Sequence, residues 1–221
     1  MTGRAARAAL AALLLLGPGP PARGAETVPA EVAGRRYAVP PALLRQDGIP
    51  PPPGGFTQAL TLQPVWPGLR PPPPGHGLSY ADGLLDILVQ DLSATTRVAG
   101  LAGLPDPQAR FLRLWRDSTA DQFALLPGFA PSSLAPVAGD APPGLLRLGP
   151  VPGSDGETSI FADAPPGQLG TVMTCRAESS CQLWWREADS AVQVTFTARL
   201  LPDWTAIRDG TAALLATLRR P

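Results

Sequence analysis

The stretch TCRAESSCQLWWREADSAVQVTFTARL, residues 174–200, holds both cysteines of the chain, two adjacent tryptophans and the clearest strand pattern in the sequence. Its second half places apolar residues at alternate positions, with polar residues between them. Alternation with a period of two puts the apolar side chains on one face of a strand. The stretch therefore predicts two antiparallel strands joined by a turn at EADS, residues 187–190.

The flanking segments extend this pattern in both directions. Upstream, TSIFADAPPGQLGTVMTC (residues 158–175) predicts two further strands around a PPG turn. Downstream of Pro202 the period changes, and a helix is expected from Asp203, as its N-cap, to Arg219. One face of that helix carries Trp204, Ile207, Thr211, Leu214, Leu215 and Leu218. The predicted fold class is α+β: one domain, an antiparallel meander packed by a C-terminal helix, with one disulfide and long proline-rich loops.

Elements are harder to assign in the first two thirds of the chain, which holds most of the 29 prolines. Residues 25–55 predict an extended proline-rich arm, in which GRRYAVP is a candidate short strand. Strands are expected at 56–63, 85–92 and 121–129, and residues 130–156 are expected to be loop. Asp106 as N-cap and Pro107 at the first helical position predict a short helix within PDPQARFLRLWRD, residues 105–117.

The N-terminus has the features of an export signal. Arg4 and Arg7 precede the apolar run 8–16, and ARG before Ala25 offers small residues for cleavage near Gly24/Ala25. The run is far shorter than the roughly 20 residues of a membrane-spanning helix. No cysteine follows it for lipid attachment, so no stable membrane anchor is expected. The expected organisation is a signal peptide at 1–24, the arm at 25–55 and an α+β domain at 56–221.

The charge of the chain excludes nucleic-acid binding, and the predicted signal indicates the compartment in which the protein works. The chain has 18 basic and 18 acidic residues, and three of the arginines lie in the predicted signal. Nucleic-acid binding needs clustered positive charge to neutralise phosphates, and no basic run is present outside the signal. We expect a periplasmic or secreted protein of a Gram-negative bacterium that does not bind nucleic acid.

Cys175 and Cys181 are the only cysteines. After export, a structural disulfide between them is the leading interpretation. A reactive pair is the second alternative, although the spacing is not that of C-x-x-C enzymes. A metal site is the third, although two thiolates fall short of the four ligands of structural zinc.

Three tryptophans are candidate binding residues. Trp184 and Trp185 are adjacent in a predicted strand, so their side chains must point to opposite faces. One can belong to the core, and the other is either exposed as an interface anchor or covered by another element. Trp66 lies beside a proline loop, and its side chain is likewise either exposed as an interface anchor or covered by another element. The PPPP runs at 50–53 and 71–74 are interpreted as loops rather than polyproline ligands.

No catalytic constellation is evident. His76, the only histidine, lies in the loop sequence PPGHG, and neither G-x-S-x-G nor a phosphate-binding loop occurs. Paired carboxylates could supply acid and base, but Asp86 and Asp91 are interpreted as solvated strand residues. We predict no catalytic residues, no metal and no cofactor.

The sequence resembles exported proteobacterial proteins without assigned function. The resemblance rests on YAVPPALL, LTLQPVWPGLRP, the C…C pair before a hairpin, and VQVTFTARLLPDWTAIRDGTAALLATL. Some small exported proteins of this kind are immunity or adaptor proteins of secretion systems. By this resemblance we expect a non-catalytic envelope protein that binds another protein, with an immunity or accessory factor as one form. The alternatives are a periplasmic hydrolase that uses paired carboxylates and a passive structural envelope component.

Overall fold

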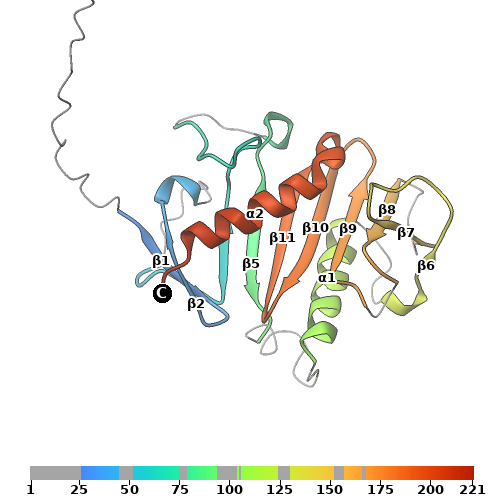
Figure 1. Cartoon of the computed structure of the whole chain (residues 1–221), viewed down its shortest axis with the longest axis horizontal. Coiled ribbons are helices and arrows are strands. Elements are labelled where there is room, and N and C mark those ends of the chain that lie inside the picture. Colours follow the sequence, from blue (N-terminus) through green and yellow to red (C-terminus); the bar gives the residue numbers. More distant parts are fainter. Residues whose placement is uncertain are drawn as a thin grey trace, which may run out of the picture.

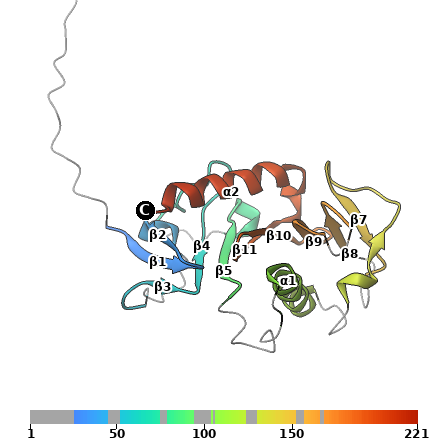
Figure 2. The ribbon, with the colours of Figure 1, turned by 60° about the horizontal axis from the view of Figure 1, so that its bottom comes forward.

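The molecule is built around one large sheet with a helix on each face (Figures 1 and 2). The computed structural model describes residues 26–44, 52–74, 79–93, 104, 106–123, 130–151, 157–165 and 168–221. The predicted signal segment and His76 lie outside these residues. The predicted α+β class, the antiparallel sheet and the packing by a C-terminal helix are confirmed.

The large sheet has eight strands, and all neighbouring strands are antiparallel. In spatial order they are β4 (Ala59–Leu62), β5 (Asp86–Asp91), β11 (Ser190–Thr197), β10 (Ser180–Glu187), β9 (Thr171–Arg176), β8 (Thr158–Ala162), β7 (Leu146–Gly149) and β6 (Ala135–Pro136). The four strands predicted between residues 158 and 200 are β8 to β11, in the order of a meander. The predicted strands at 56–63 and 85–92 are confirmed as β3–β4 and β5.

A second, three-stranded sheet lies at one end of the large one. Its strands are β2 (Arg35–Val39), β1 (Val28–Val32) and β3 (Phe56–Thr57), with β1 and β3 parallel. Short 3-10 turns complete the described elements: η1 (Pro41–Leu43), η2 (Tyr80–Asp82), η4 (Pro131–Ser133) and η5 (Ala198–Asp203).

The two helices bury different faces of the large sheet. Helix α1 (Pro107–Phe123) contributes Phe111 and Trp115, both fully buried, to an apolar cluster with Trp184 of β10. Helix α2 (Trp204–Leu218) lies on the opposite face, as the two views show (Figures 1 and 2). The sheet is therefore the middle of three layers, and both of its faces are apolar where helices cover them.

Several sequence predictions need correction. The segment 25–55 is not simply an extended arm, because β1 and β2 form a hairpin with Val32, Tyr37 and Val39 in the main core. GRRYAVP is a strand, as expected. An alternating segment this short could not reveal that its apolar face packs against a distant helix.

The middle third also differs from expectation. Helix α1 begins as predicted, with the Asp106 carboxylate accepting hydrogen bonds from the amides of Gln108 and Ala109. It continues to Phe123, so the predicted strand at 121–129 is wrong over 121–123 and otherwise lies outside the described residues. The predicted loop at 130–156 is wrong where it contains β6 and β7. β7 pairs with β8, and the two-residue β6 forms the edge of the large sheet; strands this short leave little periodic pattern in the sequence.

The start of α2 differs in one detail. Asp203 occupies the N-cap position, but its side chain makes no capping hydrogen bond. The 3-10 turn η5 precedes the helix directly, and the Trp204 amide bonds to the Leu201 carbonyl instead. The η5 turn therefore gives the first amide of the helix a backbone partner, and the expected side-chain cap by Asp203 is not formed.

A pair of glycines tests how closely the small sheet is packed. Gly54 and Gly55 both have positive φ, +84° and +91°. A Cβ on Gly55 would lie 2.0 Å from the Pro29 carbonyl oxygen, whereas a Cβ on Gly54 would meet nothing within 4 Å. We expect Gly54→Ala to lower the free energy of unfolding by about 1 kcal/mol, the cost of a left-handed residue. Gly55→Ala should lower it by about 3 kcal/mol, because β3 must also move away from β1.

Urea denaturation of the two variants, followed by tryptophan fluorescence, measures the difference. Equal losses in the two variants would contradict the close approach of residue 55 to β1.

Candidate functional site

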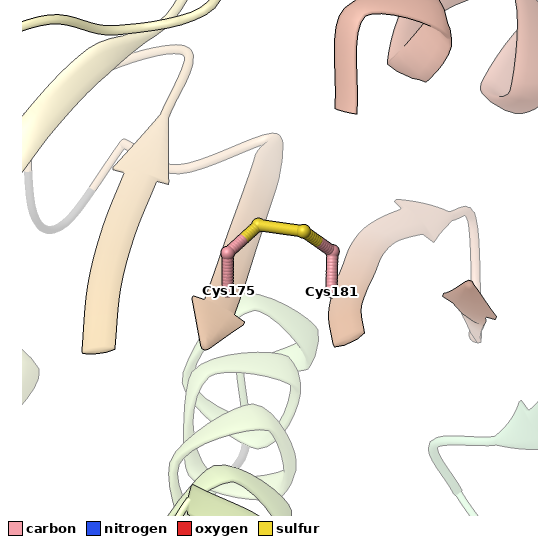
Figure 3. Close-up of a disulfide and its surroundings, with 2 residues drawn as sticks. All are labelled: Cys175 and Cys181. Carbon is pink, nitrogen blue, oxygen red and sulfur yellow. A yellow bond between two sulfur atoms is a disulfide. The ribbon is translucent and has the colours of Figure 1, made fainter. Parts of the chain in front are cut away.

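The cysteine pair forms a disulfide, as the leading interpretation predicted. Cys175 is the second-last residue of β9 and Cys181 the second residue of β10, and the two are direct partners across the antiparallel strands (Figure 3). Their S–S distance is 2.08 Å, and both residues are buried, with exposed fractions of 5% and 0%. A buried, bonded pair in the core is a structural link.

Trp184 and Trp185 point to opposite faces, as adjacent residues of a strand must. Trp184 is 1% exposed and belongs to the cluster that α1 covers, where its Nε1 donates to Oε1 of Gln182 at 3.4 Å. Trp185 is 8% exposed and belongs to the cluster that includes residues of α2. The second tryptophan is therefore covered by another element rather than exposed as an interface anchor. Neither side chain offers a surface anchor in this fold.

Trp66 is half-buried and packs against the core on the α2 side. Gly210 of α2 lies close to this loop: an added Cβ there would lie 3.8 Å from Cζ3 of Trp66 and 3.2 Å from Cδ1 of Leu69. Gly210, which weakens the helix intrinsically by about 1 kcal/mol relative to alanine, thus makes room for the 66–69 loop. Trp66 is the only one of the three candidate tryptophans that keeps a substantial exposed area.

The candidate carboxylates have ordinary partners. Oδ1 of Asp86 accepts from Nε2 of Gln63 at 3.1 Å, and Oδ2 accepts from the Tyr80 hydroxyl at 2.9 Å. Oδ1 of Asp91 accepts from the amide and the hydroxyl of Ser93. Within the described part of the chain, no group of three or more His, Cys, Asp or Glu residues is arranged to hold a metal ion.

The structure brings together a charged cluster that joins the two ends of the described chain. Nη1 of Arg35 lies 3.1 Å from Oε1 of Glu187, and Nη2 of Arg219 bonds to the same carboxylate oxygen. The hydrogen bond to Glu187 raises the pKa of Arg219 above its ordinary value; burial acts against this rise and the Tyr37 hydroxyl adds to it. Nε of Arg219 is buried without a hydrogen-bond partner in the described structure. One carboxylate thus contacts two guanidinium groups, and at least one buried N–H of Arg219 is left without a hydrogen bond.

A pocket of about 530 Å³ lies beside this cluster. We call it the N-terminal pocket, and it lies on the small sheet. Arg36 and Arg220 reach it from β2 and from the end of α2, and the Arg220 amide donates to the Arg36 carbonyl at 2.9 Å. Its lining residues are Thr27, Pro29, Ala30, Glu31, Arg36, Tyr37, Ala38, Gly54, Phe56, Thr57 and Arg220.

A second pocket, of about 480 Å³, lies at the other end of α2. Phe161 and Leu201 supply apolar surface, and Asp140 and Arg199 supply opposite charges. Its remaining lining residues are Ala141, Pro142, Pro143, Ala198 and Pro202. The charges offset each other, so this pocket has no net electrostatic preference.

The local sequence does not predict this charged cluster of Arg35, Arg219 and Glu187. Its only signal is the repetition of Arg-Arg at 35–36 and 219–220, nearly the whole chain apart. The antiparallel bridge between Tyr37 and Arg219 brings these segments together. Such a contact depends on where α2 ends over the sheet, which no short-range pattern encodes.

Comparisons with known proteins describe the fold. No family model and no curated protein sequence matches this chain. The chain is similar in structure to Smlt3025, an immunity protein of the Stenotrophomonas maltophilia type IV secretion system, with a TM-score of 0.52 and 13% identity over 92% of this chain and 98% of that chain. It is also similar to the Neisseria meningitidis iron-regulated outer membrane lipoprotein FrpD, with a TM-score of 0.45 and 11% identity over 87% of this chain and 92% of that one.

The class that follows is an α+β protein whose fold is similar to that of Smlt3025. The buried disulfide is consistent with export. Among the described residues, no helix is both long and apolar enough to cross a membrane.

The disulfide should contribute modestly to stability, because it closes a short loop. The two cysteines are six positions apart, which corresponds to about 2 kcal/mol in the chain-entropy treatment. We expect a Cys175→Ala/Cys181→Ala variant to unfold with a free energy lower by about that amount and to keep the fold. Urea denaturation of the oxidised protein, the reduced protein and the variant measures this. A loss in the variant that reduction does not reproduce would contradict the cross-link as the cause.

The charged cluster makes a salt-dependent prediction. In Glu187→Gln, Arg35 and Arg219 keep their positions but lose the shared negative charge. We expect the free energy of unfolding to fall by about 1 kcal/mol, because the three side chains are partly exposed. The loss should shrink at high NaCl, because salt screens both the lost attraction and the new repulsion.

Glu178→Gln is the matched control, since it removes the same charge from an exposed turn residue. Urea midpoints at low and high NaCl measure both variants. The same salt dependence in the two variants would mean that Glu187 does not hold the cluster.

Proposed function

We propose that this protein is an exported, non-catalytic envelope protein whose role is to bind another protein, as an immunity or accessory factor of a secretion system does. The observation that carries the proposal is the structural similarity to Smlt3025, which extends over 92% of this chain and 98% of that chain. An immunity protein acts by binding, so the proposal requires a binding surface and no reaction centre.

Three features of the chain support the proposal. The N-terminal sequence has the order of a signal peptide, with arginines, an apolar run and a cleavage site before Ala25. The buried disulfide suits an oxidising compartment. Two pockets, one of them rimmed by arginines, offer surface for a partner.

The three candidate tryptophans differ in whether they can contact a partner. Trp66 keeps part of its surface and is the candidate contact residue among the three. For Trp184 and Trp185, burial in the two cores means that any effect of substitution on binding is expected to follow loss of the fold.

The proposal is tested in the native bacterium. Cells expressing the untagged full chain are cross-linked and the envelope fraction is separated. The chain is captured with antibodies raised against the purified protein, and the proteins bound to it are identified by mass spectrometry. We expect one dominant protein, which binds the purified chain directly with a Kd below about 1 µM. An N-terminus at Ala25 in the recovered protein would support export.

A folding-deficient variant is the matched control. Trp115→Asp places a charge in a fully buried position of the α1 cluster, so it should unfold the domain. A protein that binds this variant as well as it binds the native chain recognises unfolded chain, so it is not accepted as a specific partner. Recovery of the protein alone, with only general envelope sensitivity on gene deletion, would overturn the proposal in favour of a passive envelope component.

A further inference from the structure

The large sheet ends in β6, on the side away from the three-stranded sheet (Figure 1). At its other end, the outer side of β4 is covered where Leu62 forms a backbone bridge with Leu44. Among the described residues, no backbone segment pairs with the outer side of β6. An open strand edge presents its backbone groups to any second strand, so the β6 edge is where the sheet could grow.

The side chains at the β6 edge are apolar. Val137, directly after β6, is 42% exposed, and Leu146, the first residue of β7, is 41% exposed. Among the large apolar side chains of the described residues, only these two and Tyr80 are exposed. Residues 130–139 include no charged side chain. The charges that oppose strand addition at many sheet edges are therefore missing from this segment.

The two exposed side chains lie on opposite faces of the sheet. Leu146 is opposite Ala162, which belongs to the cluster that α1 covers. The Val137 amide donates to the Arg147 carbonyl at 3.0 Å, and Arg147 is opposite Phe161, which belongs to the cluster on the α2 face. Apolar surface is present on both faces of this edge, and burying it would favour association.

Pro136 occupies the point where a second strand would pair. In β6, Ala135 is opposite Gly149 and Pro136 is opposite Leu148. Backbone groups of successive residues in an antiparallel strand point alternately to its two sides. Because the Val137 amide points to β7, the backbone of Pro136 points outward. Proline has no amide hydrogen, so the outer side of β6 offers a carbonyl but no donor at its centre.

A second copy of the chain fits this edge by symmetry. An antiparallel strand can pair with itself about a two-fold axis, and in a β6–β6 pair that axis would pass beside residue 136. Residue 136 of each copy would then exchange backbone hydrogen bonds with residue 136 of the other. Two prolines there remove both bonds and set their rings against each other. A shifted register places Pro136 opposite Leu134 or Ala138 and again loses the bond that its amide would have donated.

We infer that Pro136 keeps the β6 edge from pairing with a second copy of the chain, at a surface whose apolar side chains would otherwise favour that pairing. A single residue can have this effect because β6 is two residues long and Pro136 is the one that points outward. The inference concerns the oligomeric state of the protein, so it goes beyond the proposed function and does not depend on which partner is bound.

The experiment measures the oligomeric state of the purified chain by sedimentation velocity from about 1 µM to about 100 µM, where weak dimers dissociate. We expect the native chain to be monomeric throughout this range. Pro136→Thr restores the amide with a residue that favours strands, and it should give a reversible dimer. The dissociation constant of that dimer should be at least about tenfold below the limit set by the native chain, because two backbone hydrogen bonds become available.

Two further variants separate edge pairing from other effects. Pro73→Thr makes the same substitution at an exposed proline outside the described strands and should stay monomeric. Pro136→Thr/Val137→Lys places the lysines of the two copies diagonally on one face, about 7–8 Å apart, and should restore the monomer by repulsion. Misfolding cannot produce that recovery. Thermal melting of each variant shows whether it is folded.

The inference is overturned if folded Pro136→Thr stays monomeric at the highest concentration, if Pro73→Thr associates equally, or if Val137→Lys does not reverse the association. A native chain that already dimerises and is dissociated by Val137→Lys would overturn it, because Pro136 would then not close the edge. A Pro136→Thr variant that does not fold would do the same, since Pro136 would then be needed for the fold itself. The capture of a partner in cells tests the proposed function separately.

Discussion

The burial of two adjacent tryptophans on opposite faces of one strand is the constraint on which the rest of the structure depends. Each such side chain contributes about 150–250 Å² of surface that must be removed from water, so β10 needs a cover on both sides. Trp184 packs in the cluster that α1 closes, and Trp185 packs in the cluster that α2 closes. A sheet with one helix could satisfy only one of them, which is why the molecule has three layers.

The same strand also joins the two ends of the described chain. β10 ends at Glu187, whose carboxylate meets Arg35 and Arg219. Apolar burial is the larger contribution, because burying a side chain such as Val39 is worth about 1.5–3 kcal/mol, whereas a partly exposed ion pair is worth about 1 kcal/mol or less. Burial therefore holds the N-terminal hairpin in the domain. The backbone bridge between Tyr37 and Arg219 places the end of α2 against β2, and the ionic cluster adds to that contact.

Covering both faces of the large sheet restricts where a partner can bind. The surface that remains comes from elements that bury only one face, above all the three-stranded sheet, and from the pocket between η5 and the Asp140–Pro143 loop. In each region charges of opposite sign lie together: Glu31 is the strand partner of Arg36 in the first, and Asp140 and Arg199 line the second. The disulfide contributes to stability from within the core and takes no part in either surface.

The sequence by itself determined local features: individual strands, one helix and the disulfide. Period-two alternation identified β8 to β11, and the change of period after Pro202 identified α2. The expected export of a chain with two cysteines predicted the Cys175–Cys181 disulfide. Tertiary structure alone decided the N-terminal hairpin, the length of α1 and the fate of the tryptophans. Each of these depends on apolar contacts between segments far apart in the chain. The charged cluster of Arg35, Arg219 and Glu187 depends on the backbone bridge between Tyr37 and Arg219. Side-chain periodicity specifies which face of an element is apolar, but only packing specifies what covers that face.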